Sequence, residues 1–390
     1  MLQKTQIDQL VNQFISAGEY AGASLLVIKD GEELIREVYG EADMEHQIPV
    51  HQNTIFHLYS MSKPITAVAV MKLCEQGKLQ LQDEVSKYLP CFKNMTVWTE
   101  KGEVPAERDI TIWDCLNMTS GIPYPCQELE SGRRLDKVFR HLIARREAGE
   151  TVDTMEWVQE VSKVPLVFQP GEKWMYGFSA DVLGAVVEAV SGKRFGRFLQ
   201  EEIFTPLGME DTGFFVPEEK RHRFAVSYEK WSCDRLKPFT ASHLGEYYNE
   251  DVAFESGGAG LVSTIDDYAK FAQMLLNKGC LGNVRILQEE TVRFMARNHL
   301  TDAQRTDYTW DSVRGYGYGC LMRCLEDTVM ADTKGSIGEF GWDGWTGNYV
   351  TVNPEKTMVL LFFIQRCGEG FGELTRKVRE AVYEALETIQ

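Results

Sequence analysis

The chain has 390 residues, of which 44% are hydrophobic and 25% are charged, a composition typical of a soluble globular protein with a core of ordinary size. Its formal net charge of −17 argues against nucleic acid and anionic membranes as partners, because both bind basic surfaces. The longest apolar run, residues 358–364, is too short to cross a bilayer.

The cysteines and the first residues indicate where the protein resides. Nine cysteines are present, an odd number with no C-x-x-C spacing, so we expect free thiols in a reducing compartment. The opening sequence, MLQKTQ, lacks the basic-then-apolar pattern of a signal peptide. The seven histidines form no ligand pair such as H-E-x-x-H. We therefore expect a cytoplasmic protein that holds neither a metal nor a cofactor.

The first eighty residues predict a helix, a hairpin of two strands and a second helix. Apolar residues at helical spacing predict a helix over residues 6–17. Two strand-like runs follow, over 23–29 and 33–39, and Asp30-Gly31 between them is a strong hairpin signal. The next helix is predicted over 61–76.

The middle of the chain is predicted to be mainly helical and to end in a long polar stretch. Helical spacing predicts helices over four ranges, 111–117, 155–161, 180–190 and 195–203. Residues 217–250 are polar, with aromatic residues scattered through them, and predict an irregular segment. Because a loop of this length is usually functional or disordered, we expect it to form a flap over the active site.

The last part of the chain predicts three successive antiparallel strands, over 338–345, 349–352 and 358–364, and a final helix over 372–386. Strands near both ends, with helices between them, predict an α/β (α+β) fold in which helices flank an antiparallel sheet. Its discontinuous α/β domain would comprise residues 1–80 and 250–390. A mainly helical subdomain, residues 81–249, would be inserted, with the active site between the two parts.

A serine and a lysine three residues apart begin the second predicted helix. Residues at this spacing share a helix face, so the Lys63 amine can reach the Ser60 hydroxyl. The helix N-terminus favours a developing alkoxide, and partial burial lowers the pKa of the lysine toward its neutral form. Pro64 is tolerated because it lies in the first turn. A neutral lysine beside a serine is a known route to an activated nucleophile.

Other candidate nucleophiles and bases have weaker support. S-x-x-K occurs by chance once or twice in a chain of this length, and a second copy spans Ser227 to Lys230. That copy lies in the polar stretch and opens no apolar helix. His57, three residues before Ser60, is better explained by packing in a strand or turn. No G-x-S-x-G elbow is present, which disfavours an α/β-hydrolase.

Six separated motifs carry a resemblance that covers nearly the whole chain. They are FHLYSMSK at 56–63, MTSGI at 118–122, FQPG at 168–171 leading to Tyr176, PLGMEDT at 206–212, GGAGLVST at 257–264 and FGWDG at 340–344. In this order they resemble the class C β-lactamase-like serine hydrolases, which include penicillin-binding proteins, carboxypeptidases and esterases. The resemblance implies a β-lactamase/transpeptidase-like fold and Ser60 as the nucleophile. It also places the glycine run at 257–260 in a tight turn near the site.

The family's second motif, usually Y-x-N, is matched by Tyr176 to Phe178. The resemblance implies that the Tyr176 phenol takes the Ser60 proton and returns it to the leaving group, if Lys63 lowers its pKa. Without the resemblance, Tyr176 would be explained as a core tyrosine. The family's asparagine is replaced by Phe178, so the amide that would hold an acyl-amide substrate is missing.

The third motif, K-T-G or H-x-G in penicillin-directed members, is matched here by Trp342-Asp343-Gly344. Trp342 cannot bind a substrate carboxylate as the family's lysine does. The resulting W-x-G pattern resembles that of the esterase-like members. Asp343 would favour a neutral or cationic substrate, unless it is simply solvated at a strand edge. Gly344 allows close backbone approach. By analogy, the N–H groups of Ser60 and Trp345 would form the oxyanion hole.

Taken together, these features predict a serine hydrolase that cleaves an ester or small amide through an acyl-enzyme on Ser60. The substrate-binding residues would be Trp342, Asp343, Gly344, Trp345 and Phe178. Two alternatives remain: a D-amino-acid peptidase or β-lactamase, and a non-catalytic penicillin-binding sensor on the same fold. The expected partner is a small-molecule substrate, with no nucleic acid and no membrane. The sequence leaves open the oligomeric state and whether Lys63 or Tyr176 is the formal base.

Overall fold

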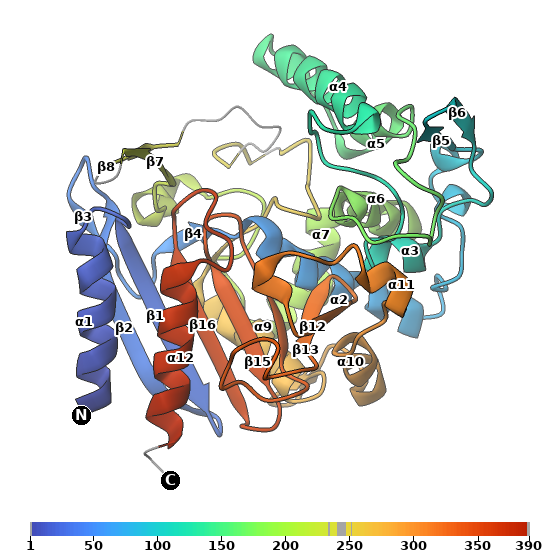
Figure 1. Cartoon of the computed structure of the whole chain (residues 1–390). Coiled ribbons are helices and arrows are strands. Elements are labelled where there is room, and N and C mark those ends of the chain that lie inside the picture. Colours follow the sequence, from blue (N-terminus) through green and yellow to red (C-terminus); the bar gives the residue numbers. More distant parts are fainter. Residues whose placement is uncertain (1, 233–234, 240–246, 251, 388–390) are drawn as a thin grey trace.

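A computed structural model describes residues 2–232, 235–239, 247–250 and 252–387 of the chain. Its centre is an eight-stranded sheet in the order β12-β13-β14-β15-β16-β1-β2-β3, in which every neighbouring pair is antiparallel (Figure 1). The strands are β1 (Gly22–Lys29), β2 (Glu32–Asp43), β3 (Ile48–Pro49), β12 (Tyr316–Gly319), β13 (Met322–Leu325), β14 (Phe340–Asp343), β15 (Tyr349–Asn353) and β16 (Met358–Ile364). The predicted antiparallel sheet is thereby confirmed with its five predicted strands, whereas β3, β12 and β13 were not predicted.

The hairpin between β1 and β2 forms where the Asp-Gly pair predicted it. Asp30 has a φ of 52° and Gly31 a φ of 85°, so both adopt the left-handed conformation that tight hairpin turns require. Beyond the turn, β1 pairs with β16 as well, with Leu26 opposite Leu361. The first and last parts of the chain are therefore joined in the middle of one sheet.

Alternating side chains of β1 supply two separate cores. Leu25 and Val27 pack with helices α1 (Leu2–Ser16) and α12 (Glu373–Glu387) on one face of the sheet. Leu26 and Ile28 belong to the larger core on the other face, with helices α2 (Ser62–Glu75) and α9 (Ile265–Leu276). In Figure 1, α1 and α12 stand in front of the sheet and α9 lies behind it. The three helices predicted at 6–17, 61–76 and 372–386 are thus confirmed.

The middle of the chain gathers into helices beside one end of the sheet (Figure 1). The four predicted helices are present as α3 (Ile112–Leu116), α5 (Thr154–Val161), α6 (Ser179–Ser191) and α7 (Phe195–Leu199), the last continuing as a π-helix over Gln200–Phe204. An 18-residue helix, α4 (Glu130–Glu147), and a hairpin of β5 (Thr96–Thr99) and β6 (Gly102–Pro105) were not predicted. Leu135 and Leu142 of α4 are buried, and Val138, Phe139 and Ile143 pack against the same core, so this helix has an apolar face that the sequence analysis did not use.

The segment 217–250 is less irregular than predicted. Its described residues form a 3₁₀ helix over Glu218–Arg223 and a hairpin of β7 (Tyr228–Ser232) and β8 (Arg235–Pro238). These strands carry little sequence signal because only Tyr228 of β7 is buried. Lys230 lies in β7 and Ser227 directly precedes this strand, so the two do not form an S-x-x-K pair on one helix face. Residues 233–234 and 240–246 lie outside the described residues, and the proposed flap stays a prediction.

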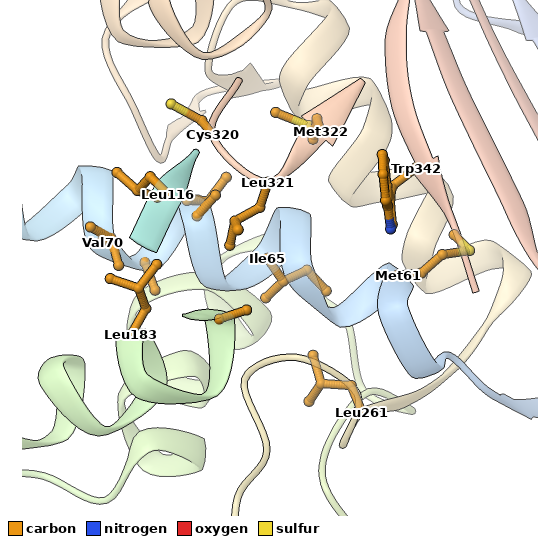
Figure 2. Close-up of a cluster of buried hydrophobic side chains, with 14 of the residues drawn as sticks. Met61, Ile65, Val70, Leu116, Leu183, Leu261, Cys320, Leu321, Met322 and Trp342 are labelled. Carbon is orange, nitrogen blue, oxygen red and sulfur yellow. The ribbon is translucent and has the colours of Figure 1, made fainter. Parts of the chain in front are cut away.

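Helix α2 runs through the interior, and every residue from Ser62 to Met71 is buried. Figure 2 shows Ile65 and Val70 on this helix, with Leu183 of α6 on one side and Leu321 and Trp342 on the other. The helix that begins at the predicted nucleophile is therefore held between the sheet and the helical region. In the part of the chain that the structure describes, no helix combines the length and apolarity that crossing a membrane requires. The predicted division at residues 80 and 250 stays a prediction.

Candidate active site

Ser60 lies where the chain enters α2. It belongs to a 3₁₀ turn, Tyr59–Met61, that leads directly into the helix at Ser62. Tyr59 has a φ of 46°, a left-handed conformation that L-residues adopt at a cost. The Lys63 amine donates a hydrogen bond of 3.1 Å to the Ser60 hydroxyl, as the helical spacing predicts. The structure therefore brings the predicted nucleophile and lysine together at a helix N-terminus.

Lys63 is completely buried and has three acceptors around its amine. Besides the Ser60 hydroxyl, these are the Tyr124 hydroxyl at 3.0 Å and the Gly258 carbonyl at 2.9 Å. Burial lowers the pKa of Lys63 to about 8, although the carboxylates of Asp181 and Asp343 oppose the shift. At pH 7, about a tenth of the molecules then carry a neutral Lys63. In that form, the amine has a lone pair that can accept the Ser60 proton.

Tyr176 lies on the other side of the nucleophile. Its hydroxyl shares a hydrogen bond with Ser60 and accepts one of 3.1 Å from the indole N–H of Trp342. The Lys63 amine is 4.6 Å from the centroid of the Tyr176 ring. Burial nevertheless raises the pKa of Tyr176, so the condition that Lys63 lowers it is not met. Tyr176 is a neutral phenol at this site, and Lys63 is the group closer to its base form at neutral pH.

Tyr124 is a site residue that the sequence did not reveal. It lies in the loop after α3, and its ring contacts those of Tyr176 and Phe178 at centroid distances of 5.5 and 4.6 Å. Its only sequence signal is its position shortly after the MTSGI motif, which ends in a turn at Gly121 with a φ of 81°. The Tyr124 hydroxyl accepts a hydrogen bond from the Lys63 amine, 61 residues away in the chain. No spacing rule connects two residues so far apart, so only the folded structure could identify this contact.

A buried carboxyl group supports Lys63 through the glycine run. Asp181, in the first turn of α6, accepts hydrogen bonds from the Ser256 hydroxyl and from the Gly258 N–H, the latter at 3.2 Å. The Gly258 carbonyl is in turn an acceptor for Lys63. A Cβ on Gly258 would lie 2.5 Å from the Asp181 carboxylate, so any other residue would displace that carboxylate. The predicted turn at 257–260 therefore lies at the site, and its packing against Asp181 favours glycine.

The end of β14 forms one wall of the site. Trp342 is buried behind Tyr176, whereas Trp345 is 42% exposed and packs edge-on against Tyr59 at 5.4 Å. A Cβ on Gly344 would lie 2.4 Å from the carbonyl oxygen of Leu58, so glycine lets this strand end approach the nucleophile turn. Asp343 is not solvated at a strand edge, because β14 is paired on both sides and its carboxylate forms an ion pair with buried Arg323.

A cavity of about 280 Å³ opens at these residues. Five of the predicted residues line it: Ser60, Tyr176, Trp342, Asp343 and Trp345. The sequence did not identify its other walls, which are Trp310, Ser312, Gly368, Glu369, Gly370 and Phe371. These come from loops with no periodic pattern. The exposed wall residue Trp345 also contacts the ring of Phe239, at 5.0 Å, from the segment predicted to be a flap.

Phe178 does not line this cavity. Its ring packs against Tyr124 and Trp157, and it borders a second, apolar cavity of about 100 Å³. Tyr59 and Ala259 also line that cavity, and both neighbour residues of the site in the chain. His57, in β4 (Ile55–His57), stacks between the rings of Tyr59 and Phe224, as a packing role predicts.

Comparisons with known proteins extend over almost the entire chain. A family model described as Beta-lactamase matches residues 7–383. Esterase EstB of Burkholderia gladioli is 31% identical over 398 residues, covering 97% of this chain and 94% of its own. Protein Rv1367c of Mycobacterium tuberculosis is 30% identical, covering 92% and 88%. The solved structure of EstCE1, a hydrolase with promiscuous acyltransferase activity, superposes with a TM-score of 0.83 at 25% identity and covers 98% of both chains.

Proposed function

Since the chain belongs to the beta-lactamase family, we propose that it is a serine hydrolase that cleaves an ester or small amide through an acyl-enzyme on Ser60. The observation that carries the proposal is the hydrogen-bonded group of Ser60, Lys63 and Tyr176 at the wall of a cavity. A folded core has no need of a completely buried lysine whose amine contacts a partly exposed serine. Such an arrangement is typical of an activated nucleophile.

In the acylation step, the neutral Lys63 amine accepts the proton of Ser60, and the serine oxygen bonds to the carbonyl carbon of the substrate. The negative oxygen that develops would face the N–H groups of Ser60 and Trp345. The close approach of Gly344 to Leu58 supports this placement, because it brings the two backbone segments together. The Tyr176 phenol, hydrogen-bonded to Ser60, then relays the proton to the departing alcohol.

In the second step, water replaces the alcohol. The neutral Lys63 amine takes a proton from the water, the acyl carbon bonds to the hydroxide oxygen, and the bond to Ser60 breaks as the serine oxygen regains a proton. The products are a carboxylic acid and free enzyme. No group outside the chain is required for either step.

The character of the walls supports esters ahead of peptides and β-lactams. Trp342 stands where penicillin-directed members of the family have a cation for the substrate carboxylate, and Phe178 replaces the amide that holds an acyl-amide. Aromatic rings from Tyr176, Trp310 and Trp342 make the main cavity suitable for an apolar leaving group or acyl chain. The relatedness to Esterase EstB supports the same reaction.

The proposal includes a cytoplasmic location and a small-molecule substrate as partner, with no nucleic acid and no membrane. The free thiols support the location, since all eight cysteines in the described part of the chain are unpaired. The acidic net charge supports the absence of nucleic-acid partners.

The proposal is tested by the release of 4-nitrophenol from short-chain esters in a stopped-flow instrument. Wild type should give a burst of one equivalent followed by steady turnover, and Ser60→Ala should give neither. Ser227→Ala is the matched control, because it alters the second S-x-x-K copy, and it should keep the burst. Equal rates in wild type and Ser60→Ala would refute the proposal, and turnover of a chromogenic cephalosporin at rates similar to the esters would favour the β-lactamase alternative.

A further inference from the structure

A buried guanidinium lies directly behind the wall of the main cavity. Arg323, in the middle of β13, is only 2% exposed. Its guanidinium carbon is 4.5 Å from the ring centroid of Phe371 and 5.5 Å from that of Trp342, both of which line the cavity. A charge buried this deeply is costly unless it is paired.

The partner of Arg323 is Asp343, the acidic residue inside the W-x-G motif. The Arg323 Nη1 atom forms a charged hydrogen bond with one carboxylate oxygen of Asp343. The second terminal nitrogen, Nη2, is buried and has no hydrogen-bond acceptor among the residues that the structure describes. The Arg323 guanidinium can therefore donate two parallel hydrogen bonds to a carboxylate, and Asp343 accepts only the one from Nη1.

Asp343 stands between the guanidinium and the cavity. Its side chain is 19% exposed and lines the cavity, and a Cβ built on Gly370, another wall residue, would lie 3.3 Å from its second carboxylate oxygen. Its charge also acts on the catalytic groups: it opposes burial, which lowers the pKa of Lys63, and it adds to burial, which raises the pKa of Tyr176. A substrate bound beside Ser60 is therefore within the field of this carboxylate.

Among the described residues that line the cavity, none is lysine or arginine. The Lys63 amine contacts the wall residue Ser60, but it is buried and does not itself line the cavity. The other acidic wall residue, Glu369, is already engaged by Arg366 at 3.2 Å and by the Tyr20 hydroxyl at 2.5 Å. A substrate carboxylate would thus meet two carboxylates on the surface of the cavity, with the cations behind them.

We infer that Asp343 determines the charge specificity of this site: it occupies the buried Arg323 as an internal carboxylate and thereby excludes substrates that carry a carboxylate of their own. The inference rests on the proposed function and narrows its substrate class to esters and small amides without negative charge. Removing the Asp343 carboxylate would leave Arg323 paired with nothing and open to the cavity. The guanidinium would then bind a substrate carboxylate, with both nitrogens available.

The test compares kcat/KM for charged and neutral versions of the same ester. Two pairs place the carboxylate at opposite ends: 4-acetoxybenzoate with its methyl ester, and the mono-4-nitrophenyl ester of adipic acid with 4-nitrophenyl hexanoate. Comparing the charged-to-neutral ratio between variants cancels the intrinsic reactivity of each ester. Asp343→Asn removes the charge, and Asp343→Ala also opens a path to Arg323. Glu369→Gln is the matched control, since it removes a wall carboxylate that does not pair with Arg323.

For at least one pair, we expect the ratio to rise about tenfold in Asp343→Ala, less in Asp343→Asn and less again in Glu369→Gln. In the double variant Asp343→Ala/Arg323→Met, which replaces the buried pair by apolar side chains, the gain should disappear. A ratio unchanged in Asp343→Ala, in protein that still hydrolyses the neutral esters, would overturn the inference and leave the proposed function intact. So would an equal rise in Asp343→Ala and Glu369→Gln. Failure of wild type to hydrolyse even the neutral esters would instead count against the proposed function.

Discussion

The charge of Asp181 should set the pH at which the enzyme becomes active. A single residue, Gly258, connects the Asp181 carboxylate to the Lys63 amine. Its N–H donates a hydrogen bond to Asp181, and its carbonyl accepts one from Lys63. A negative charge there favours the protonated amine and raises the pKa of Lys63. Asp181→Asn keeps an oxygen that can accept from Gly258 but removes the charge. The pKa of Lys63 should then fall, and more of the enzyme should carry the free base at neutral pH.

The size of the shift follows from the geometry. Two hydrogen bonds of 2.9 and 3.2 Å through one residue place the two charges roughly 7 Å apart. At an effective dielectric constant of about 20, unit charges at that distance interact by about 2.4 kcal/mol. This energy is an upper limit, because burial raises the pKa of Asp181 and the carboxyl group therefore does not carry a full charge in every molecule. We expect the pKa of Lys63 to fall from about 8 by about one unit.

The assay is the pH profile of kcat/KM for a neutral 4-nitrophenyl ester. In wild type, kcat/KM should rise with pH through about 8, because the base form of Lys63 is required. In Asp181→Asn the midpoint should lie about one pH unit lower. Glu188→Gln is the matched control: it removes another partly buried carboxyl of α6, one that accepts from the Phe195 N–H, and it should leave the midpoint in place. A midpoint that stays put or moves upward in folded Asp181→Asn would refute the reasoning.

Three further predictions concern the site and its support. Tyr176→Phe should lower kcat/KM by about 10²–10⁴ with little change in Tm, because it removes only a proton-transfer group; a near-normal rate would remove Tyr176 from the mechanism. Gly344→Ala places a Cβ 2.4 Å from the Leu58 carbonyl oxygen, so calorimetry should show that the protein is destabilised by about 1–3 kcal/mol. The same variant should have a lower kcat/KM. Wild-type stability together with wild-type kcat/KM would contradict this close approach. Arg379→Met leaves the buried Glu339 carboxylate without its ion-pair partner, and denaturant unfolding should show that the free energy of unfolding falls by about 3–5 kcal/mol. Lys377→Met is the control on the same helix: it removes an exposed ion pair with Glu373 and should lower the free energy of unfolding by less than about 1 kcal/mol.

The sequence predicted the parts of the site that short-range spacing or a named motif determines. Ser60 and Lys63 share one turn of a helix, so their contact follows from the spacing alone. Tyr176 was identified through the resemblance of its motif, because by itself it could equally have been a core residue. The central sheet was predictable for a similar reason, since runs such as β16 are continuous apolar segments bounded by turn residues.

The remaining groups depend on contacts between distant segments. Tyr124 and Asp181 contact the site only because loops and a helix fold around Lys63. Arg323, 20 residues from its partner Asp343, is an arginine inside a short strand whose every residue is buried, and no spacing rule connects the two. Whether the pKa of Tyr176 is lowered could not be decided from the sequence, because the sequence does not reveal the burial that raises it. Helix α4 is a different case, because its apolar residues from Leu135 to Ile143 do recur at helical spacing and could have been recognised from the sequence.

The central claim is that Ser60 carries the acyl group, and mass spectrometry tests it most directly. Enzyme mixed with 4-nitrophenyl acetate is quenched in acid during turnover, digested and mapped. We expect one acetyl group on the peptide that contains Ser60, located on that residue by fragmentation, and no such adduct in Ser60→Ala. An acyl group found on another residue, or turnover in wild type with no trapped adduct on Ser60 even at low temperature, would contradict it.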